Sequence, residues 1–472
     1  MRTDVILRWT GLLSGANATR SFVLLGGVAM HAAYVFVVAT TLPAIVADIG
    51  GIAQYAWVTT VFVVGSVGGS AIAASLAGRL GLRAAYRLAT ALFVAGGGTC
   101  AMAPGMSGLL TGRALQGLGG GLLTALAYTT IRQLLPDVLR SRAIAMVSGV
   151  WGVAALSGPL FGGVFAAPNR WRDAFWLAVP LGLSYIAVTE YVLPKRSQRV
   201  EAAPVAVGRL ALLGAAALAV SAGSVPGRLW PSTVGILACV VLMAALFALD
   251  RRAQIRLLPA GAFNPRTPLG AISLTMALLV VGTGTMPFVP YVLRVAYGHS
   301  PIVAGYVGAL QALGWTCAAL VTASAGDGTA RRISAWGPIV MAVGFLGVAH
   351  TLYRGSLPLT ATAWAIVGVG IGMGWAHLGS LMIRAAAAPE RDLAAAFIST
   401  TQLIALAFGS ALAGMVANLG GLPGARTPVE VARAAFWLVA VFAVGPAAAF
   451  VSAGRVLALS PAPSPLPADL RS

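Results

Sequence analysis

The stretch Gly112-Arg113-Ala114-Leu115-Gln116-Gly117-Leu118-Gly119-Gly120-Gly121 places one arginine in the middle of a long run without other charges. Arg113 is the only charged residue between Arg87 and Arg132, and it follows the turn-forming sequence Ala103-Pro104-Gly105-Met106. In a membrane helix with a rise of ~1.5 Å per residue, Arg113 would lie ~12 Å below the surface of a ~30 Å hydrocarbon core. An arginine there costs at least ~2.5 kcal/mol, so we expect it to face a bundle interior or a wet cavity and to have a functional task.

The composition predicts a membrane protein. Only 9% of the 472 residues are charged, 58% are hydrophobic, and the mean hydropathy is +0.88. A soluble chain of this length would expose much of that apolar surface, so lipid is the expected solvent. The net charge of +19 is also typical of nucleic-acid-binding proteins, but the arginines form short clusters between apolar spans, and we expect no nucleic-acid partner.

The cysteines predict neither a disulfide framework nor a metal site or cofactor. Cys100, Cys239 and Cys317 lie inside apolar spans and show no pairing pattern. The first twenty residues contain three arginines and no cleavage-site pattern, and the apolar span that follows is too long for a signal peptide. We therefore expect it to be retained as the first helix.

Apolar windows of ~20 residues predict fourteen membrane spans. They lie near residues 21–46, 55–77, 85–104, 107–131, 143–166, 172–193, 207–224, 231–249, 268–293, 302–324, 334–352, 357–383, 393–418 and 431–456.

The distribution of basic residues predicts the orientation. With the N-terminus inside, 23 of the 31 Lys and Arg residues fall in inner segments and seven in outer segments. The positive-inside rule thus predicts a multi-pass protein of the cell (inner) membrane with both termini in the cytoplasm. Twelve spans would give the same orientation, so the number depends on the two windows at 207–224 and 231–249.

An internal repeat divides the chain. A shift of 251 residues superposes the glycines of the fourth window on those of the twelfth: Gly117 on Gly368, Gly119 on Gly370 and Gly121 on Gly372. We therefore predict a six-helix bundle in residues 1–200, a two-helix insert with a linker in 201–262, and a second six-helix bundle with a short cytoplasmic tail in 263–472.

The fourth window carries its polar residues on one helical face. Arg113, Gln116, Gly117 and Gly120 are spaced by three, four and seven residues, so glycine permits close approach where Arg113 and Gln116 supply hydrogen-bond donors. The alternative is an arginine that only locks two helices through backbone carbonyl groups.

The fifth window contains small residues and a proline. Gly158 and Gly162 form a small-xxx-small contact, Gly163 follows, and Pro159 removes one helical hydrogen bond. Tight packing without any further role explains these residues equally well.

Three segments resemble motifs of the major facilitator superfamily, and specifically of its fourteen-span drug:proton antiporters. The resemblance covers nearly the whole chain. The family's cytoplasmic gating loop is matched by Leu76–Arg83, with Gly78, Arg79, Gly81 and Arg83. Its arginine motif in the fourth span is matched by Arg113, Gln116 and Gly117. Its antiporter signature in the fifth span is matched by Gly158, Pro159, Gly162 and Gly163.

The resemblance implies an all-helical secondary active transporter with two six-helix bundles around a central cavity and two extra helices. It implies export of small lipophilic compounds by proton antiport with alternating access, and therefore a transporter rather than an enzyme. The implied partners are a small-molecule substrate, protons and the lipid bilayer, and the chain is expected to be a monomer.

The chain departs from the family pattern at its acidic positions. Tyr34 stands where the family has an aspartate in the first span, and Gly78 stands at the aspartate of the gating loop, whose second copy has Asp327. The carboxylates of the spans, Asp48, Asp173, Glu190 and Glu430, lie near span ends. The usual proton carrier is therefore missing.

Histidine is the titratable alternative. His31 is predicted near the middle of the first span, and His377 on the cytoplasmic side of the twelfth; a neutral histidine bonded to a carbonyl group remains the simpler interpretation of each. Gln311 and Gln402 are further candidates for the cavity.

Two other functions remain open. The absent carboxylates favour a weakly coupled or uncoupled exporter of a host metabolite. A channel or membrane enzyme is the alternative from another class, but the sequence contains no filter-like repeat, metal cluster or nucleophile–base pair.

Overall fold

The computed structural model describes residues 15–135, 137–167, 170–193, 206–253, 256–323 and 325–459, and this part of the chain contains helices and no strands. The first half consists of α2 (Gly15–Ile49), η1 (Ile52–Gln54), α3 (Trp57–Leu80), α4 (Leu82–Ala101), α5 (Met106–Leu134), α6 (Asp137–Phe165), α7 (Trp171–Trp176) and α8 (Ala178–Val192). The middle contains α9 (Val207–Ser224) and α10 (Leu229–Arg251). The second half consists of α11 (Pro268–Gly282), η2 (Thr283–Thr285), α12 (Phe288–Val295), α13 (Pro301–Thr322), α14 (Asp327–Tyr353), α15 (Leu357–Ala385), η3 (Ala388–Glu390), α16 (Arg391–Leu419), η4 (Leu422–Gly424), α17 (Pro428–Val441) and α18 (Val444–Leu459).

The predicted all-helical membrane fold is confirmed. Within the described residues, 11 helical segments are long and apolar enough to cross a membrane. α4, α5 and α6 are not among them, although each coincides with a predicted window, and α5 packs closely against α3 and α4. The number of fourteen crossings therefore remains a prediction.

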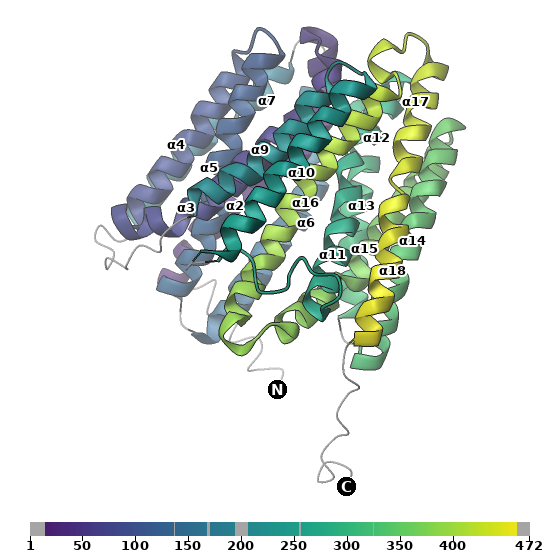
Figure 1. Ribbon diagram of the computed structural model, residues 1–472. Helices are drawn as coiled ribbons and strands as arrows, with labels where there is room; N and C mark the ends of the chain where they lie inside the picture. Colours follow the sequence, from purple (N-terminus) through teal and green to yellow (C-terminus); the bar gives the residue numbers. More distant parts are fainter. Residues whose placement is uncertain are drawn as a thin grey trace.

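The halves lie side by side and contact each other directly, and α9 packs along the seam between them. In Figure 1 the purple and blue helices of the first half lie to the left, and the green and yellow helices of the second half lie to the right. α9 packs against α10 and contacts both α3 of the first half and α16 of the second. The domain boundaries at 200 and 262 remain a prediction.

The same glycine-mediated helix crossing occurs in both halves. A Cβ atom on Gly117 of α5 would overlap the carbonyl oxygen of Phe62 in α3, and one on Gly368 of α15 would overlap that of Gln311 in α13. Gly368 follows Gly117 by 251 residues and Gln311 follows Phe62 by 249, which are the shifts of the predicted repeat. Three further contacts of the first half have an equivalent in the second half. The contact of Gly121 with Ser66 corresponds to that of Gly372 with Trp315, Gly65 with Ala114 corresponds to Gly314 with Ala365, and Gly119 with Phe93 corresponds to Gly370 with Met341. The repeat is thus present as helix packing.

The predicted gating loop is much shorter than expected. α3 continues through Gly78 and Arg79 to Leu80, and α4 begins at Leu82, so only Gly81 breaks the helix. Gly81 has a φ of 82°, a left-handed conformation that favours glycine. The prediction that Gly78 lies in a loop is wrong, because the helical hydrogen bonds of α3 extend past it.

Basic residues of this turn differ in their environment. Arg79 is exposed, whereas Arg83 donates hydrogen bonds to the carbonyl group of Leu193 and forms an ion pair with Glu190 at 3.5 Å. Arg83 therefore ties the turn to the end of α8. In the second half, Asp327 is the first residue of α14, and its side chain lies outside the described residues.

Cysteine labelling tests the two-helix insert. We expect cysteines at Pro226 and Arg252, which are both exposed, to react from opposite sides of the membrane, because α9 and α10 would each cross it once. The background is a variant with Cys239 and Cys317 replaced by alanine, since Cys100 is buried. Arg354→Cys is the control and should react from the same side as Pro226→Cys. Labelling of Pro226→Cys and Arg252→Cys from one side would refute the fourteen-span topology.

Candidate functional site

Arg113 is buried in the first third of α5. It is 2% exposed, and its Nη1 donates a hydrogen bond to Oε1 of Gln116 at 2.9 Å. Its Nε points to the carbonyl oxygen of Val58 in α3 at 3.4 Å, and its Cζ lies 3.9 Å from the ring centroid of Phe62. A buried charge needs such partners, and the aromatic face of Phe62 attracts the cation.

Four helices contribute to the surroundings of Arg113. The imidazole of His31 in α2 stacks on Phe62 with centroids 5.0 Å apart, and it meets Trp151 of α6 edge-on at 5.8 Å. We call His31, Phe62, Arg113, Gln116 and Trp151 the Arg113 cluster. Sequence analysis identified three of its members but missed Phe62 and Trp151, whose aromatic side chains in apolar windows gave no signal.

Close packing around α5 leaves two polar atoms of the cluster without partners. A Cβ on Gly120 would overlap Nδ1 of His31, and Gln116 packs against Gly96 of α4. Neither Nδ1 of His31 nor Nε2 of Gln116 has a hydrogen-bond partner. An unpartnered buried polar group costs ~1–3 kcal/mol, so the site favours a ligand or a second conformation that satisfies it.

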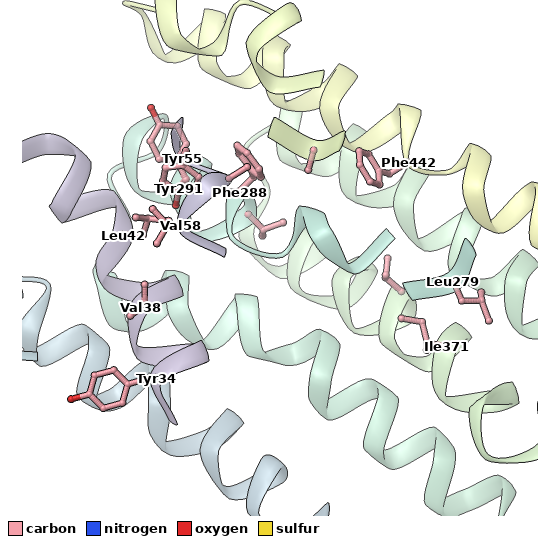
Figure 2. Close-up of a cluster of buried hydrophobic side chains, with 14 of the residues drawn as sticks. Tyr34, Val38, Leu42, Tyr55, Val58, Leu279, Phe288, Tyr291, Ile371 and Phe442 are labelled. Atoms are coloured by element: carbon pink, nitrogen blue, oxygen red, sulfur yellow. The ribbon is translucent and has the colours of Figure 1, made fainter. Parts of the chain in front are cut away.

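Tyr34 lies on the same helix as His31 but contacts other elements. Its hydroxyl donates a hydrogen bond to the carbonyl oxygen of Ala174 in α7 at 2.7 Å, and its ring meets Phe93 of α4 edge-on at 5.3 Å. In Figure 2 the side chain of Tyr34 points away from the group formed by Tyr55, Phe288 and Tyr291. The hydroxyl group is thus engaged within the first half.

The candidates of the second half lie on three helices, α13, α15 and α16. Gln311 is buried, and its Nε2 has no partner. Gln402 is half-buried on α16. His377 contacts the carbonyl oxygen of Thr322 at 3.0 Å and lines a cavity of about 110 Å³ with Arg384. The structure therefore places His377 far along α15, at its C-terminal end.

The glycines of α6 bring it close to α2 and to the second half. Gly158 packs against Phe36, and a Cβ on Gly162 would lie 2.8 Å from Cβ of Thr40. Gly163 faces Ile302 at the start of α13. Pro159 lies inside the continuous helix. These residues thus pack α6 against both neighbours.

The halves are joined at one end of the molecule, which we call the Tyr55 end and which holds residues 50–56. Tyr55 donates a hydrogen bond to the carbonyl oxygen of Pro287 at 3.0 Å. Its ring packs against Phe288 and Tyr291, each with centroids 5.1 Å away, and Figure 2 shows the three rings together. An aromatic group from the first half thus fills the start of α12.

Asn418, near the end of α16, links three parts of the chain. Its Nδ2 donates to the carbonyl oxygens of Ala53 at 2.8 Å and of Ser224 at 3.0 Å. Nε1 of Trp57 in α3 donates to the carbonyl oxygen of Ser221 at 3.2 Å. The last carbonyl groups of a helix lack partners within it, so the end of α9 offers acceptors that both halves use.

The described structure is closed at the Tyr55 end. Ser410 of α16 donates a further hydrogen bond to the carbonyl oxygen of Ala56 at 3.1 Å. Where both partners are described, the side-chain hydrogen bonds between the halves are those of Tyr55, Ser410 and Asn418, all at this end. The opposite end, which we call the Arg83 end, holds the α3–α4 turn.

An apolar crevice of about 390 Å³ lies where α3, α9 and α16 meet. Val64 and Gly68 line it from the first half, Leu210 from the insert, and Ile404 and Phe408 from the second half. Its volume lies within the ~300–1,000 Å³ typical of small-molecule sites. The crevice extends toward the Arg83 end.

The carboxylates described in the first half are paired near helix ends. Asp48 accepts hydrogen bonds from Trp171 at 3.0 Å and Arg172 at 2.7 Å, and Asp173 pairs with Arg170 at 3.2 Å. Among the described residues none of these acids belongs to the Arg113 cluster. Its charged member is Arg113 itself.

Comparison with known proteins relates the chain to membrane transporters. The sequence model described as Major Facilitator Superfamily matches residues 24–251. A probable multidrug-efflux transporter of Mycobacterium tuberculosis is 39% identical over 426 residues, which cover 87% of this chain and 89% of that protein. The tetracenomycin C resistance and export protein of Streptomyces glaucescens is 31% identical over 83% of this chain and 70% of its own length.

Solved structures show the same fold. A bacterial homologue of the human lysosomal transporter Spinster, in an inward-facing and unoccupied conformation, matches with a TM-score of 0.69 and 16% identity. The match covers 95% of this chain and 100% of that one. A D-xylose–proton symporter matches with a TM-score of 0.64 and 15% identity, over 93% of this chain and 97% of that one.

Substitution of Arg113 tests whether it acts in transport or only locks helices. We expect Arg113→Lys to lower the initial transport rate at least about tenfold, because lysine cannot both lie flat on Phe62 and reach Gln116. Arg113→Ala should remove transport while size-exclusion chromatography still shows a folded protein. Transport by Arg113→Ala at the wild-type rate would leave the helix-locking interpretation.

Substitution of Asn418 tests the closure at the Tyr55 end. Asn418→Ala removes two hydrogen bonds of ~1 kcal/mol each, so the open form should gain roughly 30-fold in its equilibrium constant. Met102 and Arg354 are exposed residues of opposite halves, and spin labels at these two positions report the distribution of distances between the halves at the Tyr55 end. Ser232→Ala, which removes hydrogen bonds within the insert only, should leave the distribution unchanged. An unchanged distribution in Asn418→Ala would contradict the assignment.

Proposed function

The chain belongs to the major facilitator superfamily, and from this premise we propose that it exports small lipophilic compounds from the cell by proton antiport. The observation that carries the proposal is the 39% identity over 87% of the chain to a relative named as a multidrug-efflux transporter. Such similarity over most of both chains favours a common transport function. Small-molecule transport, rather than catalysis, is thus the activity of this protein.

The substrate class follows from charge and surface. The crevice between α3, α9 and α16 presents apolar side chains, and the Arg113 cluster contains a buried cation without a carboxylate among the described residues. An unpaired cation repels other cations strongly at low dielectric. We therefore favour neutral or anionic lipophilic compounds over multiply cationic ones. The Streptomyces relative is named for the export of one compound, tetracenomycin C.

Orientation and mechanism are proposed from the charge distribution and the closed end. Basic residues are concentrated at the Arg83 end, so we place this end and both termini in the cytoplasm and the protein in the plasma membrane. The structure is then closed to the outside. Rocking of the halves would break the contacts of Tyr55, Ser410 and Asn418 and open the site outward.

We assign the chain to the fourteen-span drug:proton antiporters. α9 packs against both halves, α10 packs on α9, and this pair would supply the two helices beyond twelve. We keep the division into bundles 1–200 and 263–472 with the insert 201–262, and we propose a monomer. The residue motifs around Arg113 and Gly158 agree with this assignment.

Energy coupling is assigned to His31. Its imidazole lies in the Arg113 cluster, whereas Tyr34, which replaces the family's aspartate, is bonded to Ala174. In the proposed cycle His31 takes up a proton when the site opens to an acidic exterior and releases it inward. The separation of all described first-half carboxylates from the cluster favours a second candidate, an uncoupled exporter of a host metabolite.

The remaining site residues have supporting parts in this proposal. Gln311 and Gln402 are the polar side chains that the second half contributes to the transport path. Gly81 forms the cytoplasmic turn between α3 and α4, Asp327 begins α14, and these two parts separate and close during rocking. Gly78 and Arg79 at the end of α3 and Arg83 at the start of α4 flank the turn. Gly158, Pro159, Gly162 and Gly163 give α6 its close contacts with α2 and α13.

Flux measurements test function and coupling separately. A deletion strain screened against neutral, anionic and cationic drugs, tetracenomycin C included, should become sensitive chiefly to neutral and anionic compounds. Purified protein in liposomes should accumulate the identified compound under a pH gradient, and His31→Gln should remove this accumulation. His377→Gln is the matched control and should retain it, because His377 lies at the Arg83 end.

The outcomes decide between the candidates. Accumulation that survives His31→Gln would refute the role of His31. Transport without any gradient-driven accumulation by the wild type would favour the uncoupled exporter. Unchanged sensitivity of the deletion strain to all compounds would refute drug export.

A further inference from the structure

The ring of Phe62 is shared by the two residues on which the proposed coupling depends. Cζ of Arg113 lies 3.9 Å from its centroid, and the imidazole of His31 stacks on it at 5.0 Å with an angle of 19° between the planes. The guanidinium carbon of Arg113 and the imidazole centroid of His31 are therefore no farther apart than the sum of these two distances. Phe62 is 2% exposed, so water does not screen the pair from the side of the ring.

Every element packed around His31 presents a group that bears on its protonation. α5 presents the charge of Arg113 and the backbone of Gly120, α3 presents Phe62, and α6 presents Trp151. On α2 itself, the hydroxyl of Tyr34 is directed to α7. No carboxylate among the described residues faces the imidazole. A proton on Nδ1 of His31 would thus find no acceptor in the cluster as it stands.

The electrostatics of the ring permit one cation at a time. The negative face of an aromatic ring attracts a guanidinium group, and a neutral imidazole stacks on the same ring without conflict. An imidazolium would be a second cation beside Arg113, and like charges repel strongly in a desolvated site. Protonated His31 and an Arg113 seated on Phe62 therefore oppose each other.

The repeat shows that helix packing does not require an aromatic residue at this position. The equivalent crossing in the second half, between Gly368 and α13, has Gln311 in the place of Phe62. Both crossings have the same backbone contact, with the glycine against the carbonyl oxygen of the residue. The ring of Phe62 thus has a role beyond the crossing of α3 and α5.

We propose that Phe62 is the positioning residue that couples proton binding at His31 to the position of Arg113. With neutral His31, Arg113 stays on Phe62 and points to the Val58 carbonyl group, and the transporter is closed at the Tyr55 end. A proton taken from water by His31 displaces the guanidinium from the ring, which loosens α5 from α3 and favours opening at that end. This inference rests on the proposed proton coupling.

The test uses the proton as its only ligand. Spin labels at Met102 and Arg354 report opening of the Tyr55 end in purified full-length protein between about pH 4 and 8. This range reaches below the usual one for histidine, because burial and the nearby Arg113 disfavour the imidazolium. We expect the labels of the wild type to move apart as the pH falls. A trifluorinated phenylalanine at position 62 keeps the ring shape but removes its negative face, and it should abolish most of this pH response, as should Phe62→Leu.

The control is Phe345→Leu, the same substitution at a fully buried phenylalanine of α14 that should leave the pH response intact. If Phe62→Leu fails to fold, the trifluorinated variant decides. A pH response in the trifluorinated variant equal to that of the wild type would overturn the inference while leaving the proposed function in place. A wild type without any pH response would overturn both this inference and proton antiport, and drug export would still be judged by the sensitivity screen.

Discussion

The close approach of α3 and α5 at their glycines is the constraint on which the site depends. Lipid chains are as apolar as the helix surfaces, so helices in a membrane associate through close packing rather than through the hydrophobic effect. At Gly117 and Gly121 the space for a side chain is taken by the carbonyl oxygens of Phe62 and Ser66. Gly117 lies one helical turn after Arg113, so this contact holds Phe62 beside the arginine. The guanidinium group then has the ring of Phe62, the carbonyl oxygen of Val58 and the side chain of Gln116 as partners, and no carboxylate among the described residues.

The sequence predicted the parts of the fold that depend on composition and periodicity. Every described α-helix overlaps one of the apolar windows, because a membrane span needs ~20 mostly apolar residues whatever its neighbours are. The glycine spacing predicted the repeat, since small residues are required wherever backbones touch. The gating turn was misplaced because sequence alone could not show that α3 continues past Gly78, and that Gly81 carries the left-handed conformation instead.

The site was only partly predictable. A single buried charge such as Arg113 stands out in an apolar window, but Phe62 and Trp151 do not, because aromatic residues are common on lipid-facing and core surfaces alike. Asn418 was also missed, although an amide in an apolar span is a signal of hydrogen bonding between helices. Its partners, the carbonyl groups of Ala53 and Ser224, carry no sequence signature, so they become visible only when helices far apart in the chain are placed together.

The position of α9 limits how the halves can move. The carbonyl groups at its C-terminal end are bonded by Trp57 of α3 and by Asn418 of α16, so the insert holds both halves at the Tyr55 end. At its other end, Arg209 of α9 forms an ion pair with the buried Asp250 of α10, which also accepts backbone hydrogen bonds from Leu257 and Leu258. A rocking motion that opens the Tyr55 end must therefore release α9 from one half while the linker keeps its opposite end in place. The insert is thus part of the closed state itself, and the energy of that state includes hydrogen bonds that a twelve-helix transporter without α9 could not form.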